Sequence, residues 1–468
     1  MRREPQQQRN KAAEFRTMHP HAAGVDVGAS SHFVAVPPGS DGEGRRVREF
    51  EAFTCGLRSI AQWLRACGVE TVVMESTGVY WIPLFELLEA EGFEVLLVDA
   101  RHVKNVPGRK SDVRDCQWLQ ELHSYGLLAG AFRPAEQICV LRSYLRQRGM
   151  LVQHASQHIQ HMQKALTQMN LKLQQVVGDI SGVTGLKIIR ALVGGERDPQ
   201  KLAQMRDPRC KHTVAEIAKA LEGSCRAEHL FALWQALDLY DMYQRKIAEC
   251  DVQLEAHLKT FDPHDGQTPP AETPARRKVQ GNAPKFDLRS ALCRMVGVDL
   301  TEVDGLDAYT VAKVLAEIGT DMSAWPTIKH FISWLGLCPG NKISGGKVLS
   351  SRTKPCANKA ATALRIAAQT LYRSHSALGA FLRRMKTRLG PQAAITATAH
   401  KLARIIYSLL RDGGRFQDSG EAAYEERYRE RMIKSLQRKA KQLGYKLVSM
   451  AVEAAPAATV ASAFAANG

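Results

Sequence analysis

In the first 130 positions of the chain, apolar residues recur with two periods, one typical of strands and one typical of helices. Alternation of apolar and polar residues predicts a strand, a tight turn at Gly28–Ser31 and a second strand within residues 22–37, and a third strand at 45–53. Helical spacing predicts helices at 56–66 and 79–90, and short apolar runs predict strands at 70–76 and 93–100. The last run is unbroken, as in a buried central strand. With a helix that begins near Ser111, this order predicts a mixed α/β sheet.

A heptad pattern follows, in a stretch without proline from Ala135 to Asp198. Its a and d positions are apolar with the exception of Arg148, which predicts a coiled coil. A second helix, 228–258, carries a similar apolar stripe, so we expect an antiparallel hairpin that also joins copies into a homo-oligomer, a dimer or tetramer. The partner of each helix, in the same chain or in another copy, is left open by the pattern. The predicted heptad positions are Ile138, Leu141, Leu145, Arg148, Val152, Ala155, Ile159, Met162, Leu166, Met169, Leu173 and Val176.

The remaining segments differ in composition. Proline and polar residues predict a linker at 261–286, and the region after it, 287–416, reads as mostly helical. We therefore expect a basic disordered arm at 1–18, an α/β domain at 19–130, a coiled-coil helical region at 131–260, the linker, a C-terminal domain at 287–416, and a charged helix with a tail at 417–468.

Charge is distributed unevenly along the chain. The formal net charge is +17, and residues 322–411 contain fifteen Lys or Arg but neither Asp nor Glu. A surface free of negative charge over this length is what a phosphate backbone requires, so we expect a nucleic-acid partner. A basic face on an ordinary soluble domain is the alternative.

Several classes of protein are disfavoured by composition. We find no run of eighteen apolar residues, which argues against a membrane span, and the polar N-terminus lacks the apolar core of a signal peptide. The ten cysteines include no CxxC pair, which argues against a zinc ribbon or a disulfide framework. These features predict a protein of a reducing cytoplasm.

Four carboxylates form the strongest candidate for chemistry. Asp26 lies inside the first strand, Glu75 ends a later strand, and Asp112 and Asp115 are three apart at the start of a helix. Gathered at one sheet edge, they would repel one another without a cation, and hard oxygen ligands select Mg²⁺ or Mn²⁺. Two such ions can hold the attacking and leaving oxygens of phosphoryl transfer.

Each of these residues also has a purely structural interpretation. Asp112 could cap its helix, Glu75 could be a solvated strand end, and Asp99 is a rival carboxylate at the end of 93–100. His154, His158 and His161 share a helical face as metal ligands can, but no other soft ligand accompanies them. We interpret them as a solvated or interface stripe.

The order of the acidic residues resembles the RuvC-like, ribonuclease-H-type fold. More narrowly, residues 22–412 resemble the DEDD transposases of bacterial insertion sequences, the bridge-RNA-guided recombinases. The C-terminal motifs VDGLDAYTVAKVLAEIG, FISWLGLCPG, KISGGK and NKAATALRIAAQT follow that family's second-domain pattern in order and spacing. The first of these motifs also resembles a helix-hairpin-helix, but Asp307 stands where a second glycine is usual, so a structural role is equally open.

The resemblance implies a nucleophilic serine, here Ser344 of KISGGK. Glycines near it let a backbone approach a phosphate closely. No histidine lies in this segment to act as the base, so a metal or a lysine would have to help. Ser350 and Ser351 are the nearest competitors. The cations that we expect to contact nucleic acid are Lys342, Lys347, Arg352, Lys354, Lys359, Arg109 and Lys110.

The resemblance therefore implies a transposase of a bacterial insertion sequence, in the cytoplasm and on the nucleoid. Ser344 would attack a DNA phosphate and form a covalent protein–DNA intermediate, and a structured guide RNA would pair with target and donor DNA. Two alternatives are a metal-only Holliday-junction nuclease with the same carboxylates, and a non-catalytic architectural DNA or RNA binder.

Overall fold

The computed structural model describes residues 16–76, 78–99, 112–264, 281–353 and 355–448. They belong to two compact units, residues 1–133 and 134–468, and each unit is described by itself. Some predictions lie outside the described residues: most of the basic arm, the middle of the linker, the tail from 449, Arg109, Lys110 and Lys354.

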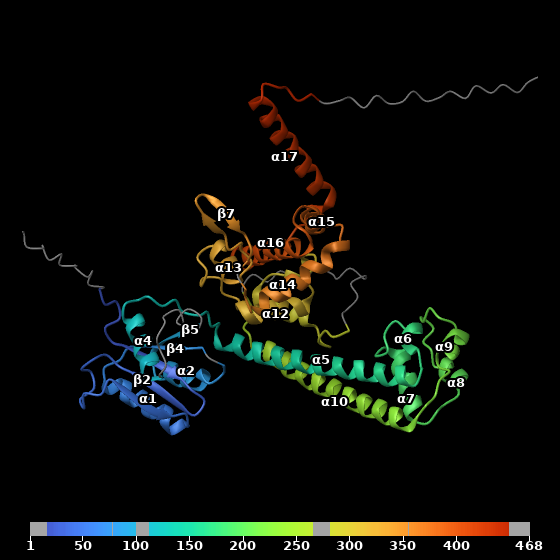
Figure 1. Cartoon of the computed structure of the whole chain (residues 1–468), viewed down its shortest axis with the longest axis horizontal. Helices are drawn as coiled ribbons and strands as arrows, with labels where there is room; N and C mark the ends of the chain where they lie inside the picture. Colours follow the sequence, from blue (N-terminus) through green and yellow to red (C-terminus); the bar gives the residue numbers. More distant parts are fainter. Residues whose placement is uncertain (1–15, 77, 100–111, 265–280, 354, 449–468) are drawn as a thin grey trace, which may run out of the picture. The chain divides into compact units, whose positions relative to one another are not determined.

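The first unit is a mixed α/β domain, as predicted. Its five-stranded sheet has the order β3-β2-β1-β4-β5, in which β1 pairs antiparallel with β2 and parallel with β4. The turn predicted at Gly28–Ser31 is present, because the Gly28 amide donates to the Ser31 carbonyl at 3.1 Å. The elements are β1 Ala22–Val27, β2 Ser31–Ala35, β3 Val47–Glu51, α1 Thr54–Ala66, β4 Thr71–Glu75, α2 Trp81–Ala90, β5 Glu94–Val98 and α4 Asp112–Ser124 (Figure 1).

Helices cover both faces of this sheet. Alternate residues of a strand point to opposite faces, so Val25 and Met74 share one core with α1 and α2, while Val73 packs against Leu119 of α4. The two layers explain why β1 and β4 are almost wholly buried.

The prediction of a central strand at 93–100 is wrong. β5 is the edge of the sheet and pairs with β4 alone among the described strands. Its outer side is covered instead by a segment of chain, since the Ala131 amide donates to the Leu97 carbonyl at 2.6 Å and Leu128 packs on the same small core as Val98. Covering an edge strand shields its apolar residues from water as a central position does. The apolar pattern alone therefore could not distinguish an edge strand from a central one.

In the second unit, two long helices lie side by side (Figure 1). They are α5, Glu136–Gln168, and α10, Ala227–Leu258, so the partner of each helix is in the same chain. The predicted heptads are wrong beyond Gln168, because the helix ends there and Asn170 takes a left-handed φ of 57°. Most of the predicted seam residues of α5 are buried, but meshing as a coiled coil stays a prediction.

Arg148, the one charged seam residue, is 1% exposed and pairs with Asp251 of α10, with Nε and Oδ1 2.5 Å apart. Its guanidinium also donates to the Asn282 carbonyl at 2.8 Å and lies over the Tyr309 ring. A buried charge is tolerated when it is paired and hydrogen-bonded. A lone arginine on an apolar stripe was the signal from which this pair could have been predicted.

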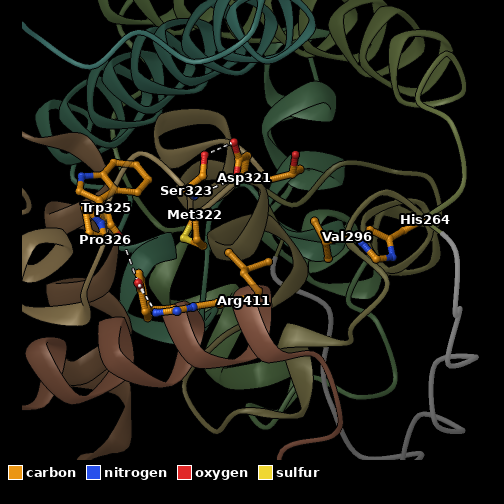
Figure 2. A pocket seen from close by; sticks show the side chains of 11 residues that line it. His264, Val296, Asp321, Met322, Ser323, Trp325, Pro326 and Arg411 are labelled. Atoms are coloured by element: carbon orange, nitrogen blue, oxygen red, sulfur yellow. Dashed lines mark hydrogen bonds between the residues drawn. The ribbon is translucent and has the colours of Figure 1, made fainter.

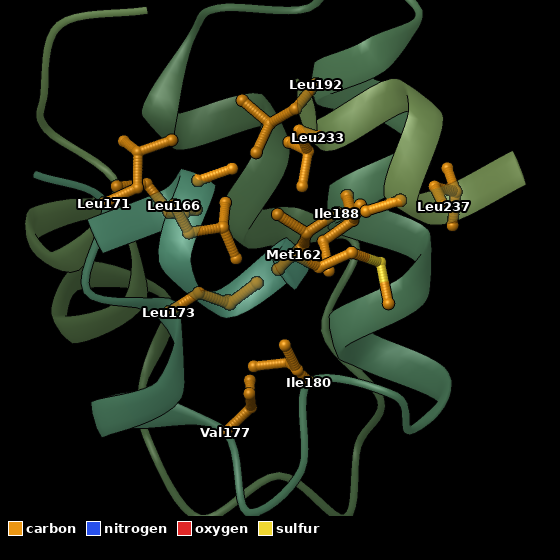
Figure 3. Close-up of a cluster of buried hydrophobic side chains, with 14 of the residues drawn as sticks. Met162, Leu166, Leu171, Leu173, Val177, Ile180, Ile188, Leu192, Leu233 and Leu237 are labelled. Atoms are coloured by element: carbon orange, nitrogen blue, oxygen red, sulfur yellow. The ribbon is translucent and has the colours of Figure 1, made fainter. Parts of the chain in front are cut away.

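In the chain between the two long helices, four short helices pack around a core that continues along the α5–α10 pair. Leu166, Ile188, Leu192 and Leu233 come together there from α5, α7 and α10 (Figure 3). The short helices are α6 Leu173–Val176, α7 Val183–Val193, α8 Pro199–Gln204 and α9 Val214–Ala220.

The rest of the second unit is mostly helical, as predicted, with one hairpin that the pattern missed. Its helices are α11 Leu288–Val296, η1 Leu300–Glu302, α12 Ala308–Ile318, α13 Ile328–Trp334, α14 Lys359–Thr370, η2 Leu371–Arg373, α15 Ala377–Leu389, α16 Pro391–Asp412 and α17 Gly420–Gln442. The hairpin is β6 Lys342–Ser344 with β7 Lys347–Ser350. Throughout the described residues, every helix is too short or too polar to cross a bilayer.

Candidate active site

Asp26 lies on the sheet face that α4 covers. It is flanked by Val25 and Val27, which point into the opposite core, so its own side chain points toward α4. Gly24, two residues earlier, shares that face. The strand thus presents one carboxylate among small residues, half-buried beneath a helix.

Gly24 is what lets α4 approach. A Cβ at this position would lie 2.3 Å from the Cys116 carbonyl oxygen and 2.4 Å from the Gln120 amide nitrogen, both backbone atoms of α4. No other residue type could occupy it without displacing the helix. Sequence reasoning missed this role, although the small residues next to Asp26 were its only signal.

The close packing brings three of the four predicted carboxylates together. Asp26, Asp112 and Asp115 each offer an oxygen within 4.8 Å of the others. Asp112 is exposed and Asp115 half-buried, and both lie in the first turn of α4, where the positive end of the helix dipole favours acidic side chains.

Glu75, the fourth, lies beside the cluster. Val25 and Met74 are register partners in the parallel pair β1–β4, so Asp26 and Glu75 follow them on the same sheet face. Its charge contributes to raising the pKa of Asp26, although its oxygens are not among the mutually close ones. Asp99 directly follows β5 and is outside the close group found among the described residues.

The cluster is electrostatically strained without a cation. Burial, and then the charges of Asp112, Asp115 and Glu75, raise the pKa of Asp26 to about 6. Burial and the charge of Asp26 raise the pKa of the neighbouring Cys116 to about 12, so this thiol stays protonated and donates to the Val113 carbonyl at 3.2 Å. Hard carboxylate oxygens without a thiolate fit Mg²⁺ or Mn²⁺ better than a soft ion.

The far end of α4 is fixed to the sheet by a histidine. The Thr71 hydroxyl and the His123 Nε2 are 2.9 Å apart, and the His19 ring stacks on His123. Burial, together with the charge of His19, lowers the pKa of His123 to about 4, so the ring is neutral near pH 7. The helix that carries Asp112 and Asp115 is therefore held to the sheet along its middle and at its far end.

Ser344 lies in the second unit, at the exposed end of β6. It occupies the last strand position before a two-residue turn. Gly345 and Gly346 have φ of 54° and 76°, which a tight hairpin turn requires and which L side chains rarely adopt.

Cross-strand pairing puts several polar groups on one hairpin face. Ser344 stands opposite Lys347, and Lys342, two residues earlier on β6, shares the face of Ser344. A bulge at the Lys342–Ile343 step places Ser350 opposite Lys342, and so on that face too. The Ser350 hydroxyl accepts from the Arg352 amide at 3.3 Å, while Ser351 follows the strand and is exposed.

The predicted nucleic-acid contacts that the structure describes are all accessible. Lys342, Lys347 and Arg352 are exposed on or beside the hairpin, and Lys359 is exposed at the first position of α14. Accessibility is what a phosphate contact needs, but their role in binding stays a prediction.

Two other motifs have structural surroundings. His154 and His158 stack on Tyr243 of α10, which agrees with an interface stripe along the paired helices. In the motif that resembles a helix-hairpin-helix, Asp307 caps α12 by accepting from the Thr310 amide at 2.6 Å, and Gly305 lies against Leu371. These contacts favour the structural interpretation of that turn.

A cavity of about 660 Å³ in the second unit is separate from these groups (Figure 2). His264, Asp321 and Arg411 are among its polar lining residues, and none of the predicted catalytic residues lines it. It is therefore not the site that the sequence predicted.

Comparison with known families identifies the class of protein. Residues 23–171, which include all four carboxylates, match a family model of DEDD transposases of the IS110 type, described as a transposase. Residues 299–383, which include Ser344, match a second model, described as the transposase IS116/IS110/IS902 family. The chain belongs to the IS110 family of transposases, enzymes that cleave and recombine DNA. No curated protein matches the chain.

Proposed function

We propose that this transposase exchanges DNA strands through a composite centre, in which a RuvC-like acidic site acts together with Ser344. Transposases of the DEDD class generally depend on a divalent metal. The proposal divides the chemistry between the two matched regions. The carboxylates hold metal and position phosphate, and the serine forms the covalent bond.

Asp26, Asp112 and Asp115 are the residues that would hold Mg²⁺ or Mn²⁺, with Glu75 beside them. Their oxygens lie within 4.8 Å of one another, and burial together with the neighbouring carboxylates raises the pKa of Asp26 to about 6. A bound ion supplies charge stabilisation to the phosphoryl group.

The serine step preserves bond energy. The Ser344 Oγ attacks phosphorus, a P–Oγ bond forms, and one P–O bond of the DNA strand breaks. The hydroxyl proton leaves Ser344, and the released DNA oxygen takes up a proton, so protons balance. A second DNA hydroxyl then reverses the attack. Strand exchange by two transesterifications needs no water and no external energy source.

The observation that carries this proposal is the polar face of the β6–β7 hairpin. Ser344 stands there opposite Lys347 and beside Lys342, in a stretch that contains no carboxylate. Two cations flanking one hydroxyl offset the negative charge that develops on an attacked phosphate.

Guide RNA and self-association complete the proposal. A structured RNA from the element would select target and donor DNA, as the family resemblance implies, and the acid-free stretch 322–411 is compatible with this partner. Coiled-coil contacts of α5 and α10 would join copies into a homo-oligomer. Purifying the protein from its native host and sequencing the RNA that accompanies it tests the first point; recovery of no discrete RNA would contradict it.

Trapping DNA products with a Ser344→Ala variant tests the serine mechanism. We expect the protein–DNA adduct and the recombined product both to disappear, while DNA binding is retained. Ser351→Ala, an equally exposed neighbour, is the matched control and should keep both products. Cleavage that persists in Ser344→Ala without an adduct would support a metal-only nuclease instead.

A further inference from the structure

The C-terminal helix α17 has two halves of opposite charge. Residues 420–426 contain three carboxylates and no Lys or Arg, whereas residues 431–441 contain five cations and no carboxylate. The whole helix lies outside the ranges that match the transposase models. Its function is therefore not covered by the family assignment.

The acidic half is held by contacts of Glu421 and Glu425. Glu421 pairs with Arg383 at 2.6 Å and with His375 at 3.0 Å, and Glu425 pairs with Arg384, all on or next to α15. Arg384 also lies over the ring of Tyr428. These contacts fix the first turns of α17 to α15 (Figure 1).

The basic half has no such partner among the described residues. Lys434, Arg438 and Lys441 are exposed, and none of them forms an ion pair with another described residue. Their spacing of four and three residues puts them on one side of the helix. The helix dipole favours cations only in the last turn of a helix. It therefore does not account for the positions of Lys434 and Arg438.

A second, apolar row runs along a different side. Met432 and Leu436 follow Tyr428 at intervals of four residues, so they continue the row that docks on α15. The basic side is thus separate from the docked side. Pairing of two α17 helices through their free halves would bring ten cations together, so charge opposes a second copy as the partner.

We propose that the basic half of α17 binds the phosphate backbone of duplex DNA, outside the catalytic centre; this rests on the transposase acting on DNA. From Arg431 to Lys441 the helix rises by about 15 Å, a length over which a duplex presents roughly nine phosphate charges. Lys434, Arg438 and Lys441, on one side of the helix, therefore face enough negative charge for each to find a phosphate. Such contacts hold the duplex without reading its sequence.

The test is the salt dependence of DNA binding by the full chain, measured by fluorescence anisotropy with a labelled duplex of random sequence. EDTA is present, so that neither metal nor cleavage contributes. The triple variant Lys434→Gln, Arg438→Gln, Lys441→Gln should reduce the slope of log K against log salt concentration by about 2 to 3, since each phosphate contact contributes ~0.9.

A second triple variant serves as the matched control. Lys187, Lys211 and Lys219 are exposed cations of the α7–α9 region, and their change to Gln removes the same charge. We expect the slope to stay at the wild-type value. An equal decrease of the slope in both triple variants would show that net charge alone causes the effect, and this would overturn the proposal. An unchanged slope in the α17 variant would overturn it as well.

Two further measurements distinguish duplex DNA from the other partners that α17 could bind. A loss confined to a single-stranded RNA probe, or a change in sedimentation of the protein alone, would assign α17 to RNA or to self-association and overturn the proposal. Because binding is measured without metal, failure of the serine mechanism leaves this result unaffected, whereas absence of duplex binding by the wild type would contradict both.

Discussion

The acidic cluster and the serine hairpin are built in opposite ways. Asp26 sits half-buried under a helix that touches the backbone of its own strand, whereas Ser344 is exposed at the tip of a two-stranded hairpin. Carboxylates that share a cation must be held in place against their own repulsion, so they need a packed scaffold. A nucleophile that attacks a large duplex needs access above all. Changes in the acidic cluster should therefore alter the stability of the fold, in either direction, and changes in the hairpin should not.

The largest effect is expected from Asp26→Asn. Removing a charged oxygen ligand should lower strand exchange by at least about 10²-fold, since charge stabilisation of the phosphoryl group is lost. The metal-free variant should nevertheless melt at a higher temperature than the wild type at pH 8, because the neutral amide escapes the burial cost and the repulsion that together raise the pKa of Asp26 to about 6. Recombination assays and thermal unfolding check the two parts. Ser344→Ala, as the comparison, should lose activity with no change in melting temperature.

The next largest effect is expected from Gly24→Ala. The new Cβ meets the Cys116 carbonyl at 2.3 Å, so α4 must move, at a cost of about 1–3 kcal/mol in the free energy of unfolding. Because α4 carries Asp112 and Asp115, metal affinity should fall as well. Chemical denaturation and calorimetry measure both. Gly42→Ala, in the same unit and with open space around its Cβ position, should change neither.

Metal binding should depend on pH through Asp26. Its pKa is raised to about 6, so in the metal-free protein the carboxyl is largely ionised at pH 7 and takes up a proton as the pH falls through 6. A proton and a cation compete for the same oxygens. Metal affinity measured by titration should be flat above pH 7 and fall by up to about tenfold per pH unit below 6. An affinity that is level from pH 7 to 5 would contradict the assignment of Asp26 as a ligand.

Gly346→Ala should have the smallest effect on stability. Its φ of 76° penalises a side chain by roughly 1 kcal/mol, but nothing lies within 4 Å of the added Cβ. We expect the strain to loosen the hairpin and slow strand exchange, with the melting temperature of the protein unchanged. Gly195→Ala, also at positive φ and in open space, strains the backbone elsewhere and should leave exchange unaffected.

The sequence was informative where period and spacing decide the structure. Alternation at residues 22–37 predicted β1, β2 and their turn, and the Asp-x-x-Asp spacing placed Asp112 and Asp115 on one helix face. It failed where the outcome depends on contacts distant along the chain. β5 is an edge strand that residues 128–131 cover, and the heptads ran on through Asn170, where the backbone turns left-handed.

The site was predicted in the same uneven way. Three carboxylates meet because Gly24 lets a helix settle on the strand, a contact that no local pattern reveals. Ser344 came from resemblance rather than from chemistry, since a short exposed hairpin has too few residues to show a period. Family comparison supports the enzyme class, while the roles of single residues stay predictions.

Identification of the amino acid bonded to DNA tests the central proposal most directly. The full-length protein is allowed to react with its DNA substrate in Mg²⁺, quenched in denaturant, digested with nuclease and protease, and analysed by mass spectrometry. We predict one phosphodiester-modified peptide containing Ser344, absent when Asp26→Asn replaces the wild type. A modification on Ser350 or Ser351, or cleaved DNA with no modified peptide, would contradict the composite serine–carboxylate centre.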